Sequence, residues 1–96
     1  MYEPLPKQVT IRKSTIHGLG LYCTHPIQKD MNLGLSHFYW EDQLMRTPLG
    51  AFYNHSDKPN VVKEEINNRF YLIALRDIWP GEEILCTYTF YNPVKS

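Results

Sequence analysis

Apolar and polar residues alternate at every second position through much of the chain, a period that predicts β-strands rather than helices. Residues 8–12, which read QVTIR, show this alternation, and residues 19–23 follow as a partner strand after a turn at His17-Gly18. Further strands are expected over residues 32–38, 61–65, 70–75 and 83–89. The pattern therefore predicts a β-rich protein of short strands.

The turns between these strands are marked by residues that favour tight bends. Asn67-Asn68 predicts a hairpin turn, and Pro80-Gly81 predicts a turn before the last strand. Residues 39–45 show the only, weak, helical pattern, and we expect Thr47-Pro48 to end it. No strand–helix–strand alternation appears, so a parallel Rossmann-type sheet is not expected. The predicted fold class is mainly β, with several small, mostly antiparallel sheets in one domain over residues 1–96.

Composition and charge narrow the function classes. The 96 residues are 43% hydrophobic and 21% charged, which is ordinary for a globular domain. Ten Lys and Arg balance ten Asp and Glu, so bulk charge does not favour nucleic acid or an anionic membrane. No run approaches the roughly 18 apolar residues of a membrane span, and the first six residues do not resemble a signal peptide. We expect an intracellular protein with no direct nucleic-acid binding and no membrane association.

Cysteines and histidines are too few and too scattered for a disulfide framework or a metal centre. Cys23 and Cys86 are far apart and neither lies in a CxxC pair, so both are predicted to be free, buried thiols. The four histidines show no HxxxH spacing, and structural zinc needs four close nitrogen or sulfur ligands. No metal site is expected. The seven tyrosines are many for so small a chain and indicate rings at wet edges or in a pocket.

Three segments carry candidate chemistry, and the first is residues 14–22, STIHGLGLY. Gly18 and Gly20, just before a strand, let backbone groups approach a ligand without a Cβ in the way. A tight hairpin that needs a positive φ explains the same glycines. A dinucleotide fingerprint is not formed, because its third glycine position is Cys23.

The second segment is FYNHSDKPN over residues 52–60, and the third is RDIWPGEEILCTY over residues 76–88. Asn54, His55 and Ser56 in succession are typical of a loop whose side chains bond backbone groups. Taken alone, His55 fits a partly buried histidine as well as a ligand contact. The third segment reads as a loop, a Pro-Gly turn and a strand that ends at Tyr88; on its own, that tyrosine fits packing.

Together and in this order, the three segments resemble the SET-domain protein lysine methyltransferases. The resemblance lies in a GxG flanked by Ser-x-Ile, an F-x-NHS-x-x-PN element and an R-D-I-x-x-G-E-E-I-x-x-x-Y element. It covers residues 9–88 and leaves a short tail over 89–96. It implies a SET fold with a C-terminal pseudoknot, S-adenosyl-L-methionine as the methyl donor, and a protein substrate with a target lysine.

The resemblance also implies roles for individual residues. Asn54 would bind the amino-acid moiety of the donor, and His55 would meet its adenine through the backbone. Tyr88 matches the catalytic tyrosine. Main-chain contacts to the donor would come from His17, Gly18, Leu19 and Gly20. Candidates for lining the substrate channel are Tyr53, Phe90 and Tyr91, for which core packing is an equal alternative.

The implied reaction suits these residue types. A lysine amine has a pKa of about 10.4 in water and must lose its proton before it attacks a sulfonium methyl. An aromatic channel beside a sulfonium disfavours the ammonium form by desolvation and repulsion. A tyrosine hydroxyl, with an ordinary pKa of about 10, is a poor base at neutral pH. We therefore assign Tyr88 to orientation and electrostatics.

The chain also departs from the family pattern. The insert that usually separates the first sheet from the NHS element is nearly absent, and the tail after Tyr88 holds no cysteine for a zinc segment. Either a second copy or a partner protein then completes the pocket, or the pocket stays open and the activity is weak; we favour a homodimer. Such brevity is typical of a bacterial or viral relative, the latter acting in host cytoplasm or nucleus. Two alternatives remain open: a catalytically silent SET-fold binding or assembly module, and a methyltransferase acting on a non-protein amine.

Overall fold

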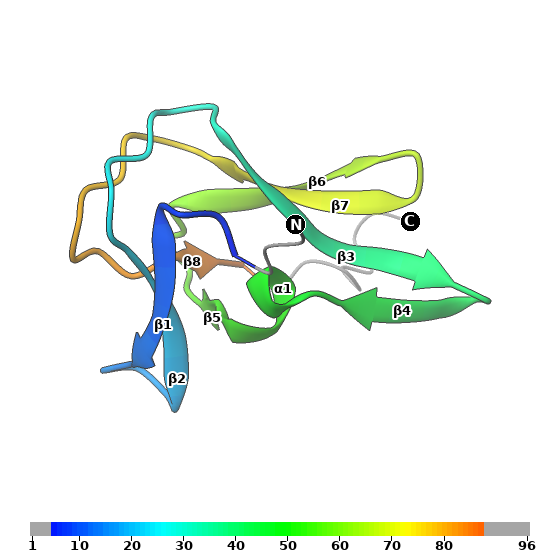
Figure 1. Ribbon diagram of the computed structural model, residues 1–96, viewed down its shortest axis with the longest axis horizontal. Coiled ribbons are helices and arrows are strands. Elements are labelled where there is room, and N and C mark those ends of the chain that lie inside the picture. Colours follow the sequence, from blue (N-terminus) through cyan, green and yellow to red (C-terminus); the bar gives the residue numbers. More distant parts are fainter. Residues whose placement is uncertain (1–4, 88–96) are drawn as a thin grey trace.

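The computed structural model describes residues 5–87, which form short strands and one short helix (Figure 1). The catalytic candidate Tyr88 and the channel candidates Phe90 and Tyr91 lie outside these residues. In chain order the elements are β1 (Val9–Lys13), β2 (Leu19–Cys23), β3 (Asn32–Trp40), β4 (Gln43–Arg46), α1 (Pro48–Phe52), β5 (Asn54–His55), β6 (Val61–Ile66), β7 (Arg69–Ala74) and β8 (Leu85–Cys86).

Within the described residues, the strands pair into three small sheets. β1 and β2 form an antiparallel hairpin, and the largest sheet has the antiparallel order β4-β3-β7-β6. β5 and β8, far apart in sequence, pair in parallel at the centre of the molecule (Figure 1). The prediction of a mainly β fold with small, mostly antiparallel sheets is confirmed, and the β5–β8 pair is the parallel exception.

Residues with left-handed backbone join the hairpins of the large sheet. Asn67 and Asn68 have φ of 53° and 66° and connect β6 to β7, as the Asn-Asn pair predicts. Glu41 and Asp42 have φ of 49° and 66° and connect β3 to β4 in the same way. Two consecutive positive φ values match the right-handed twist of the flanking strands, so both turns close tightly.

The helix predicted over residues 39–45 is wrong, because that segment is the end of β3, its turn and the start of β4. The helix begins instead at Pro48, with Thr47 as its N-cap; the Thr47 hydroxyl accepts a hydrogen bond from the Gly50 N–H at 3.3 Å. Proline is favoured in the first turn of a helix because its missing N–H needs no partner there. Thr47-Pro48 is therefore a helix start rather than a helix stop.

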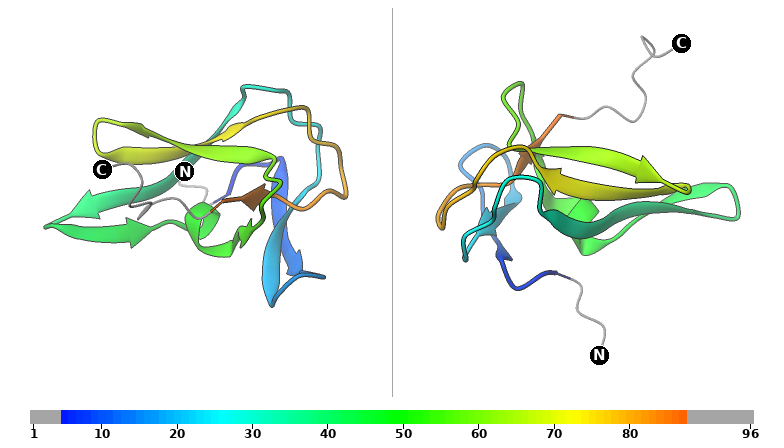
Figure 2. Two further views of the ribbon diagram at one scale, coloured as in Figure 1. Left: turned by 180° about the vertical axis from the view of Figure 1, so that it is seen from behind. Right: turned by 90° about the horizontal axis from the view of Figure 1, so that it is seen from above.

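The core lies where the sheets, α1 and the long loops meet. Its fully buried aliphatic side chains include Leu21, Ile27, Leu49, Leu72, Ile78 and Ile84. The loop over residues 24–31 runs beside residues 76–84, joined by a bridge between Ile27 and Ile78, and both lie at the end of the molecule near the β1–β2 hairpin (Figure 2). This arrangement places residues 76–84 of the third motif segment beside the first motif segment, residues 14–22.

Two smaller predictions also meet the structure. Cys23 and Cys86 are buried free thiols, as expected. The last predicted strand, residues 83–89, is regular only over Leu85–Cys86 among the described residues, while Glu83 forms an isolated antiparallel bridge with Tyr22. No helix within residues 5–87 is long and apolar enough to cross a membrane.

Candidate functional site

The turn between β1 and β2 is held by Ser14. Its hydroxyl accepts hydrogen bonds from the N–H groups of Ile16 and His17, at 2.9 and 3.3 Å, and its own N–H donates to the Gly18 carbonyl at 2.7 Å. Gly18 has a φ of +50°, and a Cβ there would meet nothing within 4 Å. The hairpin explanation therefore accounts for Gly18, because the backbone angle and not a close approach calls for glycine.

Asn54, at the start of β5, connects all three motif segments. Its side chain is buried, and Nδ2 donates to Glu83 Oε2 at 2.7 Å and to the carbonyl oxygens of His17 and Leu19, both at 3.3 Å. The acceptors come from the β1–β2 turn, from β2 and from the segment before β8. The structure thus brings the sequence-predicted residues His17, Leu19 and Asn54 to one place.

Glu83 is the residue that the sequence analysis missed. Besides Asn54, its carboxylate accepts hydrogen bonds from the hydroxyls of Ser14, at 2.9 and 3.1 Å, and Tyr22, at 3.2 Å. Neither ion pair found in residues 5–87 involves Glu83. We call the set of Ser14, Tyr22, Asn54 and Glu83, with the carbonyls of His17 and Leu19, the Asn54 hub.

Gly20 is required by the Asn54 hub itself. It is buried, and a Cβ at this position would overlap Glu83 Oε2 and lie 3.1 Å from Asn54 Nδ2. The close approach that the sequence predicts for Gly20 is thus made, within the described residues, by a carboxylate of the same chain. The two glycines of the GxG element are needed for different physical reasons.

Asn60 fastens the second motif segment to the third. Its Nδ2 donates to the Glu83 carbonyl and its Oδ1 accepts from the Leu85 N–H, both at 2.8 Å. Further along, the Thr87 hydroxyl donates to the Ser56 carbonyl at 2.8 Å. These bonds and the parallel β5–β8 pair fix the chain beside Asn54 up to the residue that precedes Tyr88 in the sequence.

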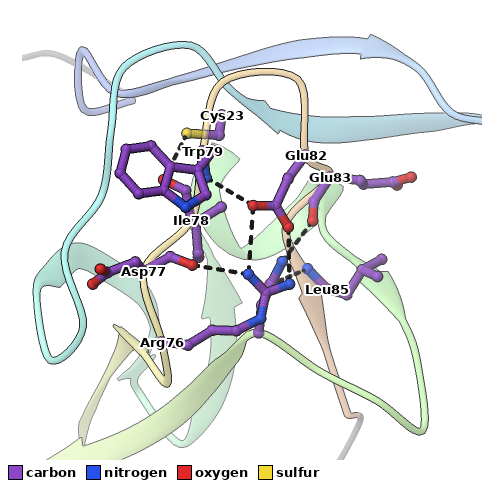
Figure 3. A network of polar contacts seen from close by, with 9 residues as sticks. Cys23, Arg76, Asp77, Ile78, Trp79, Glu82, Glu83 and Leu85 are labelled. Carbon is purple, nitrogen blue, oxygen red and sulfur yellow. Dashed lines mark hydrogen bonds and ion pairs between the residues drawn. The ribbon is translucent and has the colours of Figure 1, made fainter.

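The remaining polar residues of the third segment form a separate network that folds its turn (Figure 3). Arg76 pairs with Glu82 at 2.9 Å and donates to the Asp77 carbonyl at 2.8 Å, while Glu82 also accepts from the Trp79 N–H at 2.8 Å. The hydrogen bond from Arg76 is the main cause that lowers the pKa of Glu82. The side chain of Glu83 is directed away from Arg76 (Figure 3).

Tyr53 lies in the interior beside basic side chains. It is 5% exposed, its ring meets His37 edge-on at 6.3 Å between centroids, and the Lys63 ammonium lies 5.7 Å from its ring centroid. Burial, with the nearby charges of Lys63 and Arg46, lowers the pKa of His37 to about 4, and burial also lowers the pKa of Lys63. Its contacts with His37 and Lys63 give Tyr53 a packing role in the described structure.

His55 is exposed, and its Nε2 lies 3.4 Å from Asp57 Oδ1. Its backbone, by contrast, is fixed by the parallel pairing of β5 with Cys86 in β8. Among the described residues, no group of three or more His, Cys, Asp or Glu side chains could hold a metal ion.

Comparisons with known proteins agree with this geometry. A model of the SET domain family matches residues 34–89. No curated protein matches the chain. A proposed histone methyltransferase of Plasmodium falciparum has a similar structure, with a TM-score of 0.71 and 25% identity over 90% of this chain and 96% of that one.

Two further solved structures share the fold at lower identity. The methyltransferase domain of human PR domain-containing protein 2 has a TM-score of 0.71 and 22% identity over 92% of this chain and 81% of that one. A chain of the Chaetomium thermophilum Polycomb Repressive Complex 2, bound to GSK126, has a TM-score of 0.73 and 18% identity over 94% of this chain and 17% of that one. With a family model that matches more than half of its length, this chain belongs to the SET domain family.

Proposed function

We propose that this chain is a methyltransferase that uses S-adenosyl-L-methionine to methylate the side-chain amine of a lysine in a protein substrate. Membership of the SET domain family supports the proposal, as does the structural similarity to lysine methyltransferases. The observation that carries it is the Asn54 hub, which joins the three motif segments around one buried amide.

The residues at the Asn54 hub fit the amino-acid end of the proposed donor. That end carries an α-ammonium, which needs hydrogen-bond acceptors. The hub is rich in acceptors, since the carbonyls of His17 and Leu19 and the Glu83 carboxylate all face Asn54 Nδ2. We propose that the main chain of residues 17–20 and the Asn54 side chain hold this end, and that the backbone of His55 meets the adenine.

The donor, when bound, supplies an electrophilic methyl group on a sulfonium. Because methyl transfer needs alignment more than acid–base chemistry, the proposed task of Tyr88 is to orient the lysine nitrogen with its hydroxyl. Tyr53, Phe90 and Tyr91 are proposed to line a channel that excludes water and favours the neutral amine. The lysine proton leaves to solvent before transfer.

Substitution of Tyr88 tests this assignment. With a labelled methyl donor and a mixture of lysine-containing peptides, we expect Tyr88→Phe to slow transfer by roughly 100-fold, the usual cost of a lost positioning hydrogen bond in an active site. Binding of the donor, followed by calorimetry, should be unchanged because the Asn54 hub does not include Tyr88. Turnover equal to that of the wild type would contradict the assignment.

We also propose that residues 1–96 act as one domain and that a second copy completes the pocket. Large apolar side chains stand exposed on the β4-β3-β7-β6 sheet, among them Trp40 at 63%, Ile66 at 48% and Val62 at 41%. These exposed apolar side chains are the part of the chain that an association surface would cover. Sedimentation at micromolar concentration should show a dimer, and a sharp monomer would contradict this part of the proposal.

A further inference from the structure

We propose that Glu83 is a positioning residue that makes the site selective for a methyl donor with a free α-ammonium group. The inference rests on the proposed function, and it adds a residue and a specificity to it. It arises from the charge of Glu83, from the part that Glu83 takes in orienting the Asn54 amide, and from the space that Gly20 leaves for the carboxylate.

Within the described residues, the charge of Glu83 is not balanced by an arginine, unlike that of Glu82, which pairs with Arg76. Its half-buried carboxylate accepts hydrogen bonds from the neutral donors of Ser14, Tyr22 and Asn54, with no cation within ion-pair distance in residues 5–87. The Arg12 guanidinium lies over the Tyr22 ring, 5.8 Å from its centroid. A carboxylate held in this way gains strongly from a nearby cation, because charge-assisted interactions are the strong ones where water is partly excluded.

Glu83, together with the carbonyls of His17 and Leu19, determines which end of the Asn54 amide faces a ligand. The three oxygens around Nδ2 are acceptors, so the amide must present its NH₂ group to them. The carbonyl oxygen Oδ1 consequently points the other way, and no donor among the described residues reaches it. An α-ammonium supplies the donor that Oδ1 needs, and the negative charge of Glu83, which is hydrogen-bonded to Nδ2 of the same amide, favours a cation there.

Contacts within the chain hold Glu83 beside Asn54. Gly20 leaves the space for Glu83 Oε2, and the bridge between Tyr22 and Glu83 holds the two backbones together. A glutamine at position 83 would keep an acceptor for Asn54 but remove the negative charge, while the carbonyls of His17 and Leu19 would still hold the Asn54 NH₂ group.

The test compares two ligands that differ only at the amino-acid end. S-adenosylhomocysteine carries the α-ammonium and α-carboxylate, whereas 5′-methylthioadenosine carries neither. We expect Glu83→Gln to weaken S-adenosylhomocysteine by about 10- to 100-fold in calorimetric titration, the range for hydrogen bonds to charged groups. The affinity for 5′-methylthioadenosine should stay within about 2-fold. Glu82→Gln is the matched control and should leave the ratio of the two affinities unchanged.

Several outcomes would overturn the inference. Equal losses for both ligands in Glu83→Gln would mean that Glu83 has only a structural role. A change of the ratio by Glu82→Gln as large as that by Glu83→Gln would mean the same. If Glu83→Gln does not fold, as judged by circular dichroism, Glu83→Asp replaces it; it keeps the charge but shortens the reach to Asn54, and a ratio equal to that of the wild type would contradict the positioning role. A wild type that binds neither ligand would refute the proposed function itself, which is a different result.

Discussion

Glu82 and Glu83 are adjacent in the sequence, but the carboxylate of Glu82 pairs with a cation whereas that of Glu83 is bound by neutral donors. Glu82 pairs with Arg76 at 2.9 Å, within a network that closes the turn before β8. Glu83 is directed away from Arg76 (Figure 3), and its half-buried carboxylate accepts hydrogen bonds from two hydroxyls and one amide. One carboxylate has its cation within the chain, and the other has neutral partners beside two backbone carbonyls.

The difference indicates a structural role for Glu82 and a role in ligand binding for Glu83. A carboxylate paired with arginine on a half-exposed turn adds modestly to stability. Because arginine already balances its charge, such a carboxylate attracts a charged ligand only weakly. The Glu83 carboxylate helps to orient the buried Asn54 amide, and it carries a negative charge that a bound cation would offset. Substitutions around Glu83 should therefore change ligand binding, whereas substitutions around Glu82 should change mainly stability.

Gly20→Ala should have the largest effect on ligand binding. A Cβ at this position displaces the Glu83 carboxylate, which can rotate away because it ends a flexible side chain. We expect the chain to fold but to lose affinity for S-adenosylmethionine on the order of 100-fold, since the charged contact and the Asn54 orientation are lost together. Gly18→Ala is the matched control: it strains a positive φ without meeting another atom, so its loss of affinity should be smaller. Equal losses would contradict the special role of Gly20.

Asn54→Ala should weaken the donor by about 10-fold, because one hydrogen bond to a charged group is lost while Glu83 keeps its charge. Calorimetric titration with S-adenosylmethionine measures the change. Thermal unfolding in parallel separates binding from folding, since Asn54 also ties the β1–β2 turn to β5. An affinity equal to that of the wild type would exclude Asn54 from the site.

Arg76→Met tests the other region and should have the smallest effect. We expect a loss of less than about 1 kcal/mol in the free energy of unfolding at neutral pH, because the pair with Glu82 is half exposed. Binding of S-adenosylmethionine should not change. A loss of affinity comparable to that of Asn54→Ala would end the distinction between the two regions.

The stability difference between the wild type and Arg76→Met should also depend on pH. Arg76 lowers the pKa of Glu82, so the stabilisation is present above the unfolded value of 4.5 and is lost as the pH falls through the folded value. The difference in melting temperature between wild type and Arg76→Met should therefore shrink in acid. Buried His37, with a pKa of about 4, also destabilises the fold as the pH falls from 6.5, but it does so in both proteins and cancels from the difference. A difference that does not change with pH would contradict the account.

Much of the fold could be predicted from the sequence because local pattern determines it. Alternation places β1, β2, β6 and β7 to within a residue or two, and Asn67-Asn68 identifies the turn between β6 and β7. The helix at Pro48 could not be separated from a loop by periodicity, since it is only five residues long. The prediction of a helix over residues 39–45 failed because this segment holds no glycine or asparagine to mark a turn. The positive φ at Glu41 and Asp42 arises from the pairing of β3 with β4.

The site was predicted only in part for a different reason. The side-chain hydrogen bonds within the Asn54 hub join residues that lie 29 to 69 positions apart in sequence, and tertiary folding brings these residues together. One signal was available, because successive side chains of an extended chain point to opposite sides. If Glu82 meets Arg76, Glu83 must face the other way, toward the first motif segment.

The most direct test of the central claim is calorimetric titration of the wild-type chain with S-adenosylmethionine and with its demethylated product. We predict saturable binding of one ligand per chain for both. The absence of binding up to millimolar ligand would contradict the proposal that the Asn54 hub holds a methyl donor.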